Sequence, residues 1–407
     1  PHVVSCKSLD EALAQISARC QPLPGGRVNL GEASGRVLRE TVFATEDFPA
    51  NDRSTRDGYA ILSGDDSESF SIVDTLHAAD WKPRQLKSGE AVRVATGASL
   101  PCENLRVVMQ ENVARTHEKI KIRRGESGLN IRKRGEEMRA GDSVLAAGTR
   151  LNAGALALLA TVGGAQPLVS PKLRVVHFTT GDEIISPDKK PLPGQIRDSN
   201  SILIRALLEK FPCDATQQHL PEDFETAKRE ISAFRFPLSA FDLVLVSGGA
   251  SVGDKDFTRP LLEWLGFEIV FDRINIRPGA PLIFGVGGGA SVRASRIAFG
   301  LPGNPLSHFV CFHLFVAAAL AKLAGAEPLK FSAATLAAKL DDAPNPRETL
   351  WPARCKIHNG KMELTPLRWS SSGDVTALVK TNALIRVPPN QGLFAAGTAV
   401  EFLPVDF

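Results

Sequence analysis

Apolar runs alternate with amphipathic segments between residues 173 and 323, and this alternation limits the possible folds more than any other feature. Residues 173–178 and 241–246 are nearly continuous apolar runs of strand length, and each is followed by a turn that contains Gly. Residues 223–234 have the apolar spacing of a helix, and residues 198–200 can cap a further helix. The alternation predicts a mostly parallel sheet with helices on both faces and ligands beyond the carboxyl ends of the strands.

The segments on either side of this region follow other patterns. Residues 8–11 form a capping box and predict a helix over residues 8–20. Residues 45–139 contain short β-like runs separated by Gly, Pro, Asn and Asp, which indicates a compact β-rich domain. Residues 355–364 alternate in polarity on both sides of an Asn-Gly pair, which predicts a hairpin. An apolar helix over about residues 304–323 would close the α/β region.

Composition excludes several classes of protein. The chain has 407 residues, enough for two to four domains, and its 48 Lys and Arg nearly balance its 45 Asp and Glu. This balance excludes a histone-like binder of nucleic acid but is compatible with a local anion site. The apolar stretch 309–323 contains His313 and Lys322 and is shorter than a membrane span, so we expect a buried helix and no membrane partner. Residues 1–7 lack a basic segment followed by an apolar one, so we expect no signal peptide and a cytoplasmic location.

Common metal and nucleotide motifs are missing from the sequence. The six cysteines lie far apart and form no C-x-x-C pair, which excludes a zinc ribbon or a thioredoxin-type motif and favours buried reduced thiols. Neither a Walker A motif nor an H-E-x-x-H motif occurs, which removes P-loop NTPases and zincins.

A glycine-rich segment follows the second predicted strand and resembles a ligand-binding turn. Residues 247–253 read SGGASVG, and glycines after a strand let backbone amides approach a phosphate. The hydroxyls of Ser247 and Ser251 would add donors, and the carboxylates of Asp254 and Asp256 could hold Mg²⁺. A glycine-rich βα turn without a ligand is the other interpretation, and the residues alone do not choose between the two.

The same segment fits the G-x-S-x-G nucleophile elbow, so a serine hydrolase that uses Ser251 is an alternative. His308, His313 and His358 follow it in the chain and could serve as the base. Acidic residues and a proline within residues 254–260 interrupt the helix that such an elbow needs, which argues against a hydrolase. We expect His308 and His313 to be packing residues of the apolar helix.

Two further segments are candidate anion sites. Arg273 and Arg277 lie four residues apart on a strand-like run, so both side chains are expected on one face, where they suit bidentate contacts with oxyanions. Residues 300–307 form a Gly- and Pro-rich turn before the apolar helix, where amides and the Ser307 hydroxyl would lie at the positive helix end. Solvated surface charge and a scaffold turn are the competing interpretations.

Six motifs in a fixed order carry a resemblance that covers essentially the whole chain. They are DGYA at residues 57–60, TGA at 96–98, NIRKRGE at 130–136, TGDE at 180–183, SGGASVG at 247–253 and LPGNP at 301–305. Together they resemble the molybdopterin molybdenumtransferases of the MoeA type, which are similar to the E domain of gephyrin. The resemblance explains the segment around Ser251 better than a hydrolase does.

The resemblance implies an α/β multidomain fold and an elongated homodimer. The parts would be an N-terminal linker and dimerisation domain (1–46 with 140–170), a β-rich insert (47–139), an α/β molybdopterin-binding domain with a doubly wound, mostly parallel sheet (171–327) and a C-terminal β-barrel (328–407). The active cleft would lie between the α/β domain of one subunit and the β-rich insert of the other.

The resemblance also implies the reaction. Adenylylated molybdopterin and molybdate would give the molybdenum cofactor and AMP, with Mg²⁺ as the metal cofactor. A transient contact with a molybdopterin adenylyltransferase would supply the adenylylated pterin, and no nucleic acid partner is expected.

Acidic positions of the family fall on Glu183, Asp223 and Asp256, which would bind Mg²⁺ and polarise the phosphoanhydride. Glu222 is adjacent to Asp223, and the choice between these two acids stays open at this point.

Polar positions of the family fall in three further groups. Asp57, Thr96 and Arg132 of the β-rich insert would position the pterin or the nucleotide. Arg273 and Arg277 stand where the family usually has lysines, so the charge is kept with a different geometry. The remaining residues predicted to contact the pterin nucleotide or molybdate are Ser247, Gly248, Gly249, Ser251, Gly253, Pro302, Gly303, Asn304, Ser307, Arg347 and Ser372. The last three match positions expected to hold molybdate, a dianion that needs several donors.

Three residues depart from the family pattern. Ala280 stands where a lysine near the molybdate is common, so a positive charge is missing from the predicted oxyanion site. Arg56 replaces a small apolar residue, and Glu137 replaces Asp. The change at Ala280 supports a different hypothesis, a non-catalytic pterin-binding or scaffold protein of the same fold. It is also compatible with a relative that hydrolyses a different pyrophosphate and with an enzyme that uses tungstate in place of molybdate.

Overall fold

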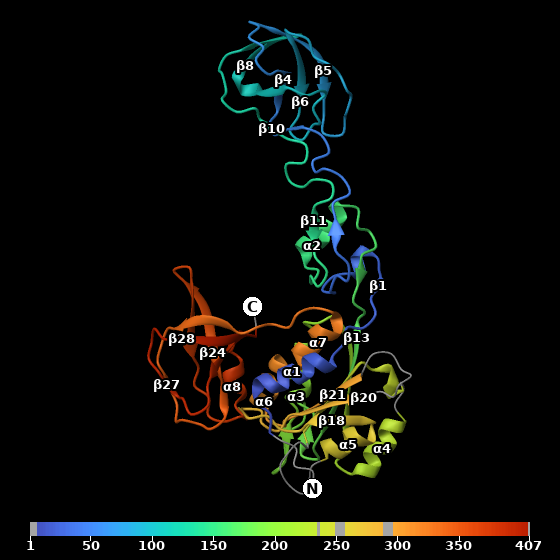
Figure 1. Ribbon diagram of the computed structural model, residues 1–407, viewed down its shortest axis with the longest axis vertical. Coiled ribbons are helices and arrows are strands. Elements are labelled where there is room, and N and C mark those ends of the chain that lie inside the picture. The colour runs from blue at the N-terminus through green and yellow to red at the C-terminus, as the bar shows by residue number, and fades with distance from the viewer. Residues whose placement is uncertain (1–5, 234–236, 249–256, 288–295, 406–407) are drawn as a thin grey trace. The chain divides into compact units, whose positions relative to one another are not determined.

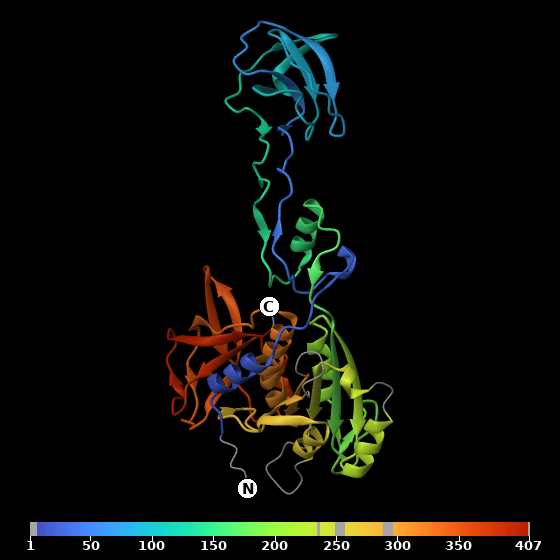
Figure 2. The same ribbon diagram turned by 45° about the vertical axis from the view of Figure 1, so that its right-hand side comes forward.

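The computed structural model describes residues 6–233, 237–248, 257–287 and 296–405. The chain divides into two compact units, the first comprising residues 1–40, 148–152 and 166–407 and the second residues 41–147 and 153–165. Figures 1 and 2 show the first unit as an α/β part with a β-barrel beside it, and the second unit as a smaller β-rich part.

A six-stranded sheet forms the centre of the first unit, in the order β16-β13-β17-β21-β20-β18. Its strands are β13 (Leu173–Thr180), β16 (Cys213–Leu220), β17 (Leu243–Ser247), β18 (Phe267–Phe271), β20 (Ile283–Gly287) and β21 (Arg296–Leu301). β16, β13, β17 and β21 run parallel, and β20 is antiparallel to both of its neighbours. The four parallel strands therefore end at one edge, as the alternation of apolar runs predicted.

Helices cover both faces of this sheet, because successive residues of a strand point to opposite sides. Leu243 and Leu245 of β17 belong to one core, with α1 (Leu9–Arg19) and α3 (Asn200–Leu208). Val244 and Val246 belong to a second core on the other face. That core includes residues of α4 (Phe224–Ser232) and α5 (Thr258–Trp264). The predicted doubly wound sheet is confirmed.

The long apolar helix consists of α6 (Pro305–Cys311), a π-helical turn (Phe312–Val316) and α7 (Ala317–Ala324). It begins at the N-cap Asn304 with a proline in its first turn, and it ends at Gly325, whose φ is +82°. Both ends thus carry the residue types that start and stop helices.

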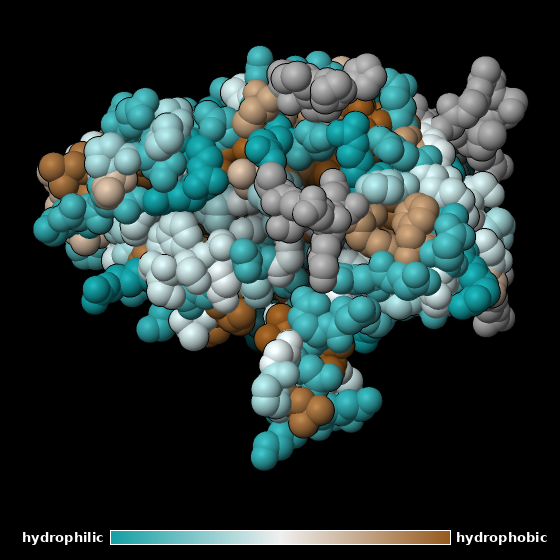
Figure 3. All heavy atoms as spheres, turned by 90° about the horizontal axis from the view of Figure 1, so that it is seen from below, coloured by the Kyte–Doolittle hydropathy of each residue, from teal (hydrophilic) through white to brown (hydrophobic). Residues whose placement is uncertain are grey.

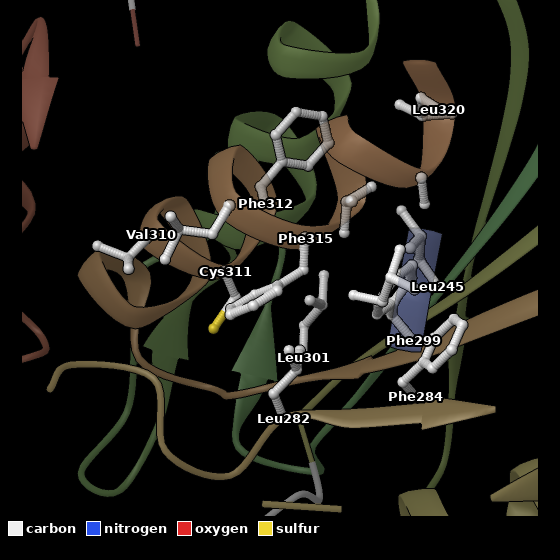
Figure 4. Close-up of a cluster of buried hydrophobic side chains, with 14 of the residues drawn as sticks. Leu245, Leu282, Phe284, Phe299, Leu301, Val310, Cys311, Phe312, Phe315 and Leu320 are labelled. Carbon is white, nitrogen blue, oxygen red and sulfur yellow. The ribbon is translucent and has the colours of Figure 1, made fainter. Parts of the chain in front are cut away.

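Length and composition alone would allow this helix to cross a membrane, with a hydropathy of 1.7 over its most apolar window. However, 72% of that window is buried inside the protein. Figure 4 shows Cys311 and Phe315 of this helix in one buried cluster with Leu245 and Leu301 of the sheet. It is a core helix, as predicted.

A closed β-barrel lies at the C-terminal end of the first unit. Its five strands are β22 (Ser332–Leu336), β24 (Glu348–His358), β25 (Lys361–Pro366), β26 (Ala383–Val387) and β28 (Ala399–Pro404). The barrel closes because β24 pairs with both β25 and β26. Asn359 and Gly360, both with positive φ, form the turn of the predicted hairpin. The short strand β19 (Ile276–Arg277) adds to β24, and α8 (Val375–Leu378) lies between β25 and β26 in the chain.

A second six-stranded sheet, β7-β4-β6-β5-β9-β8, forms the second unit. Its strands are β4 (Gly58–Leu62), β5 (Phe70–Leu76), β6 (Glu90–Val94), β7 (Leu105–Met109), β8 (Val113–Thr116) and β9 (Lys119–Ile122). Ala60 and Tyr59, neighbours on β4, belong to two different buried clusters. The unit also holds β2 (Val42–Phe43) paired with β11 (Ser143–Leu145), β3 (Arg53–Ser54) paired with β10 (Ile131–Arg132), and α2 (Ala153–Thr161). The predicted β-rich part is confirmed.

Short elements complete the described chain. The remaining pairs are β1 (Gly26–Arg27) with β12 (Leu168–Val169), β14 (Ile184–Ile185) with β15 (Ile196–Arg197), and β23 (Leu340–Asp341) with β27 (Leu393–Phe394). Single 3₁₀ turns occur at Leu30–Glu32, Gln110–Asn112 and Leu238–Ala240. All six cysteines are free, and Cys20, Cys311 and Cys355 are buried. On the face seen in Figure 3, hydrophilic residues predominate and hydrophobic ones form small separate groups.

Candidate active site

A cavity of about 670 Å³ lies at the carboxyl ends of the parallel strands in the first unit. Its walls include Thr179 and Thr180 of β13, Ser247 of β17, and the turn after β21. The segment 277–281, Arg347 and the loop 369–372 complete it on the side of the barrel. The cavity therefore lies where the sheet topology predicts a ligand site.

One side of the cavity carries Glu183 and Glu222, here called the acidic wall. Gly181 ends β13 with a φ of +133°, and a Cβ added there would lie 3.0 Å from Oε2 of Glu183, so the turn that presents this carboxylate requires glycine. The backbone N–H of Glu222 donates to Oδ1 of Asp182 at 3.2 Å, which links the two acidic segments.

Asp223 has a different position from its neighbour. It is the N-cap of α4, where its carboxylate accepts a hydrogen bond from the backbone N–H of Thr226 at 2.8 Å. Hydrogen bonds from Thr226 hold the pKa of Asp223 below its ordinary value. Glu222 lines the cavity and Asp223 does not.

Another part of the lining carries Arg277 and Arg347, here called the basic wall, with Ala280 between them in the chain. Arg277 forms an ion pair with Asp342, and its guanidinium carbon lies 5.3 Å from the centre of the Trp369 ring. Arg347 is exposed, and no residue in the described part of the chain forms an ion pair with it. The basic wall therefore has one anchored and one unpaired cation.

Serine hydroxyls lie beside the basic wall, in the loop 370–372 and at Ser307. Asp374 fixes this loop: its carboxylate accepts hydrogen bonds from the backbone N–H and the hydroxyl of Ser370 and caps α8 through Thr376. Nδ2 of Asn304 donates to the hydroxyl oxygen of Ser372 at 2.9 Å, which joins the loop to the start of α6. The bonds that Asp374 accepts hold the pKa of its carboxyl below the ordinary range. These hydroxyls form a set of positioned hydrogen-bond donors for an oxyanion.

The cavity floor consists of the Ser247–Gly248 turn and the turn at Pro302, Gly303 and Asn304. Gly248 has a φ of +96°, and a Cβ there would lie 2.5 Å from the carbonyl oxygen of Thr180, so no other residue fits. The hydroxyl of Ser247 is buried between two histidines rather than exposed as an additional donor. No pattern in the sequence predicted this arrangement.

Arg273 does not join Arg277 at the cavity. The run that was expected to be a strand has regular pairing only at β19, and only Arg277 of the two arginines lines the cavity. Arg273 is exposed and outside the cavity lining, and its backbone carbonyl accepts a hydrogen bond from the N–H of Lys7 at 3.1 Å. The structure therefore places one of the two predicted arginines at the cavity.

Several predicted residues cannot be placed. Gly249, Ser251, Gly253 and Asp256 lie outside the described residues, as does the rest of the glycine-rich segment after Gly248. The possible nucleophile elbow falls entirely within this segment.

In the second unit the structure brings two of the three predicted residues together. The backbone N–H and the hydroxyl of Thr96 both donate to Oδ1 of Asp57, at 2.7 and 3.1 Å. Arg132 on β10 forms an ion pair with Glu137 at 2.7 Å. The longer acid at position 137 thus reaches the arginine that the resemblance assigned to ligand binding.

Among the residues that the structure describes, no group of three His, Cys, Asp or Glu side chains lies close enough to hold a metal ion by itself. The acidic wall supplies two carboxylates, Glu183 and Glu222. Mg²⁺ usually takes one or two carboxylates and completes its octahedron with waters and substrate phosphates. The donor set therefore fits Mg²⁺ bound together with a phosphate substrate.

Several residues of the cavity were not predicted from the sequence, among them Asp198, Asn200 and Trp369. Asp198 and Asn200 were assigned to helix capping alone, although both line the cavity, and Asn200 donates to the carbonyl oxygen of Gly303 at 2.7 Å. Trp369 packs against the core and also lines the cavity. Its position immediately before a run of serines was the only available signal.

Known families match three consecutive regions of the chain. The MoeA N-terminal region (domains I and II) matches residues 7–163, a probable molybdopterin binding domain matches residues 177–322, and the MoeA C-terminal region (domain IV) matches residues 333–405.

Two named relatives cover nearly the whole chain. The molybdopterin molybdenumtransferase of Staphylococcus epidermidis is 32% identical over 406 residues, which span 97% of this chain and 95% of the relative. The molybdopterin molybdenumtransferase of Haemophilus influenzae is 33% identical over 409 residues, which span 98% of both.

Solved structures agree with these relatives. The crystal structure of the molybdopterin biosynthesis MoeA protein from Pyrococcus horikoshii OT3 has a TM-score of 0.78 at 27% identity and covers 98% of this chain and 100% of that one. A molybdenum cofactor biosynthesis protein from Pyrococcus furiosus, at 20% identity and a TM-score of 0.58, shares the fold. The chain belongs to the MoeA family of molybdopterin molybdenumtransferases.

Proposed function

We propose that this protein inserts molybdate into adenylylated molybdopterin in a Mg²⁺-dependent reaction that releases AMP. The observation that carries the proposal is the presence in one cavity lining of carboxylates together with arginines and serine hydroxyls. A phosphoanhydride with Mg²⁺ suits the acidic wall, and a molybdate dianion suits the basic wall. Membership of the MoeA family supports the same assignment.

Glu183 and Glu222 would hold Mg²⁺, which supplies Lewis-acid polarisation of the phosphoanhydride when bound. Glu222 takes the place of Asp223 in this proposal, because Glu222 lines the cavity whereas Asp223 caps α4. Asp256 keeps the metal-binding role that the resemblance implies, as a prediction.

The basic wall would bind molybdate. Arg347 offers an unpaired charge, Arg277 offers a charge shared with Asp342, and Ser307 and Ser372 offer hydroxyl groups. These groups would compensate for Ala280, which supplies no charge. A water oxygen forms a bond to the pterin phosphorus, the P–O bond from this phosphorus to AMP breaks, and AMP departs with its own phosphate and the bridging oxygen.

Release of AMP from adenylylated molybdopterin tests the proposal. We expect the purified protein to release AMP when both Mg²⁺ and molybdate are present, and much less when either is omitted. A family relative of known activity serves as the positive control. No AMP release under conditions in which the relative turns over would refute the proposal.

Further predictions rest on the family resemblance. They are a homodimer, the four-part division at residues 46, 139, 170 and 327, a cytoplasmic location, roles for Asp57, Thr96 and Arg132 in binding the pterin nucleotide, and a transient contact with a molybdopterin adenylyltransferase. Light scattering of the purified chain would test the dimer.

One specific observation supports the alternative of a non-catalytic pterin-binding protein: Ala280 lies in the cavity wall. Tight binding of adenylylated molybdopterin without AMP release would favour it. A serine hydrolase has less support, because both ring nitrogens of His308 are engaged, by the Pro302 carbonyl and by Ser247. His308 is therefore not free to act as a base.

A further inference from the structure

A chain of hydrogen bonds runs beneath the cavity and joins five elements of the first unit. It begins at Arg205 of α3, whose Nε lies 2.9 Å from Oε1 of Gln217 on β16. Nε2 of Gln217 lies 2.9 Å from Nδ1 of His177 on β13. Nε2 of His177 lies 2.6 Å from the hydroxyl oxygen of Ser247, at the end of β17.

The chain continues from the cavity floor into the long helix. The hydroxyl oxygen of Ser247 lies 3.1 Å from Nε2 of His308 on α6. Nδ1 of His308 lies 2.9 Å from the carbonyl oxygen of Pro302. The two histidines thus hold Ser247 and Pro302, one residue from each turn of the floor.

Both imidazole rings are neutral in this setting. His177 and His308 have no exposed surface, and their ring centres are 6.4 Å apart. Burial and, to a smaller extent, the neighbouring His308 lower the pKa of His177 to about 3. Burial also lowers the pKa of His308 to about 4, against the opposing effects of its bond to Pro302 and the charge of Asp198.

The end at Pro302 fixes the direction of the bonds next to it. A carbonyl oxygen only accepts, so Nδ1 of His308 carries the hydrogen, and Nε2 of the neutral ring accepts the hydroxyl proton of Ser247. Because a hydroxyl has one hydrogen, Ser247 must accept from Nε2–H of His177. Nδ1 of His177 is then an acceptor.

The end at Arg205 demands the same direction independently. A guanidinium only donates, so Oε1 of Gln217 faces Arg205 and the amide nitrogen faces His177. The two amide hydrogens go to Nδ1 of His177 and to the carbonyl oxygen of Ser201, at 2.9 Å each. Every bond therefore runs one way, from Arg205 to Pro302.

We propose that His177 and His308 are positioning residues, which hold the two turns of the cavity floor in register through this one-way chain without touching the substrate. The hydroxyl hydrogen of Ser247 is committed to His308, and the backbone N–H of Gly248 donates to the carbonyl of Leu301 at 3.3 Å. This part of the floor gives the ligand a shape rather than hydrogen-bond donors. Only the experiments that measure turnover rest on the proposed function; the hydrogen-bond chain itself does not.

Nitrogen NMR of ¹⁵N-histidine-labelled protein tests the chain without any substrate. We expect His177 as the Nε2–H tautomer and His308 as the Nδ1–H tautomer, both unchanged between pH 5 and 8. His177→Gln and His308→Gln variants assign the two signals among the eight histidines. The opposite tautomer in either ring, or titration of either ring within this pH range, would overturn the proposal.

Gln217→Glu tests the same chain from its far end. A carboxylate cannot donate to Nδ1 of His177, so that ring must take up a proton there, and we expect it to titrate between pH 5 and 8. The KM of this variant for adenylylated molybdopterin should then rise as the pH falls. The KM of the wild type should show no pH dependence that comes from His177. An unchanged tautomer and an unchanged pH profile in this variant would contradict the one-way chain.

His308→Phe removes the hydrogen bonds of the ring to Ser247 and Pro302 and replaces the imidazole by a ring of similar volume. We expect KM for adenylylated molybdopterin to rise about tenfold while kcat changes less than about threefold, because the floor is displaced and no reacting group is lost. His308→Gln should recover most of the affinity, since its amide oxygen can accept the Ser247 proton. His313→Phe, on the same helix but outside the chain, is the matched control and should match the wild type.

Equal KM in His308→Phe and the wild type would refute the positioning role. If no variant and no wild-type protein releases AMP, the proposed function fails, whereas the NMR result still decides the hydrogen-bond chain. If His308→Phe does not fold, the tautomers of the wild type and the pH profile of Gln217→Glu decide the proposal.

Discussion

The acidic and the basic wall of the cavity hold their charges in different ways. Glu183 and Glu222 have no ion-pair partner in the described part of the chain, whereas Arg277 is tied to Asp342 and stacked on Trp369. Within the basic wall itself, Arg347 is as unpaired as the two acids. A charge with a partner also supports the fold, whereas one without a partner is available to a ligand. Substitutions at Glu222 and Arg347 should therefore lower activity without lowering stability, whereas substitutions at Arg277 should lower both.

The largest effect is expected on the acidic wall. Glu222→Gln should lower AMP release about a hundredfold or more, because it removes one of the two carboxylates proposed to hold Mg²⁺. Increasing Mg²⁺ should recover part of the rate. The measurement is AMP release as a function of Mg²⁺ concentration.

The neighbouring residue provides the control. Asp223→Asn should stay within about twofold of the wild type in turnover, and α4 should remain capped because Asn is as good an N-cap as Asp. Asp223→Ala should cost about 1 kcal/mol of stability with little change in rate. Loss of turnover in Asp223→Asn with normal turnover in Glu222→Gln would reverse the assignment of the metal-binding acid.

The second effect is expected on the basic wall. Arg347→Ala should raise the KM for molybdate about thirtyfold, as the loss of a charged hydrogen bond of about 2 kcal/mol implies, and leave the unfolding midpoint unchanged. Arg277→Ala should raise the same KM and also lower the free energy of unfolding by about 1 kcal/mol, because its ion pair and its ring contact are lost. Equal losses of stability in the two variants would contradict the conclusion that Arg277 supports the fold and Arg347 does not.

The third effect concerns the floor between the walls and appears as a dependence of stability on pH. His177 and His308 are neutral in the fold, with pKa values of about 3 and 4, but take up protons near pH 6.5 when unfolded. The unfolded chain thus binds more protons between about pH 4 and 6.5, so stability is complete above this window and is lost as the pH falls through it. Each histidine contributes a slope of up to about 1.4 kcal/mol per pH unit.

Urea unfolding at several pH values measures this slope. His308→Phe should lower the slope by one proton relative to the wild type. An identical slope in His308→Phe and the wild type would show that the pKa of His308 is not depressed in the fold.

The smallest effect should come from adding a charge to the basic wall. Ala280→Lys places a cation in the cavity lining and should lower the KM for molybdate about fivefold at low salt, with less effect at high salt because mobile ions screen it. The same change in the Arg347→Ala background should recover part of the lost affinity. No recovery in the double variant would show that position 280 lies too far from the bound anion.

Local patterns in the sequence were sufficient for the elements of the fold. The capping box at Ser8 and Glu11 and the Asn-Gly turn at 359–360 appear where their residues predicted them, because each depends on neighbours within four positions. The position of the cavity followed from the predicted parallel sheet, which places ligands beyond the carboxyl ends of its strands.

Contacts between distant parts of the chain were not predictable. Ser247 lies 70 residues from His177 and 61 residues from His308, so no local pattern indicates that its hydroxyl is engaged. The choice between Glu222 and Asp223 needed the position of the helix start, which boundary predictions do not fix to one residue. Arg273 was expected beside Arg277 at the anion site, whereas only Arg277 reaches the cavity, which depends on the packing of the barrel against the sheet domain and not on local spacing.

The loop that Asp374 fixes has a consequence for the speed of binding. Without a ligand, Ser370 is already held by the Asp374 carboxylate and Ser372 by Asn304. Binding of a dianion therefore costs little conformational entropy of the loop. Association should then proceed without a slow closing step, at a rate set by diffusion and by attraction to the arginines, and decrease smoothly as salt is added.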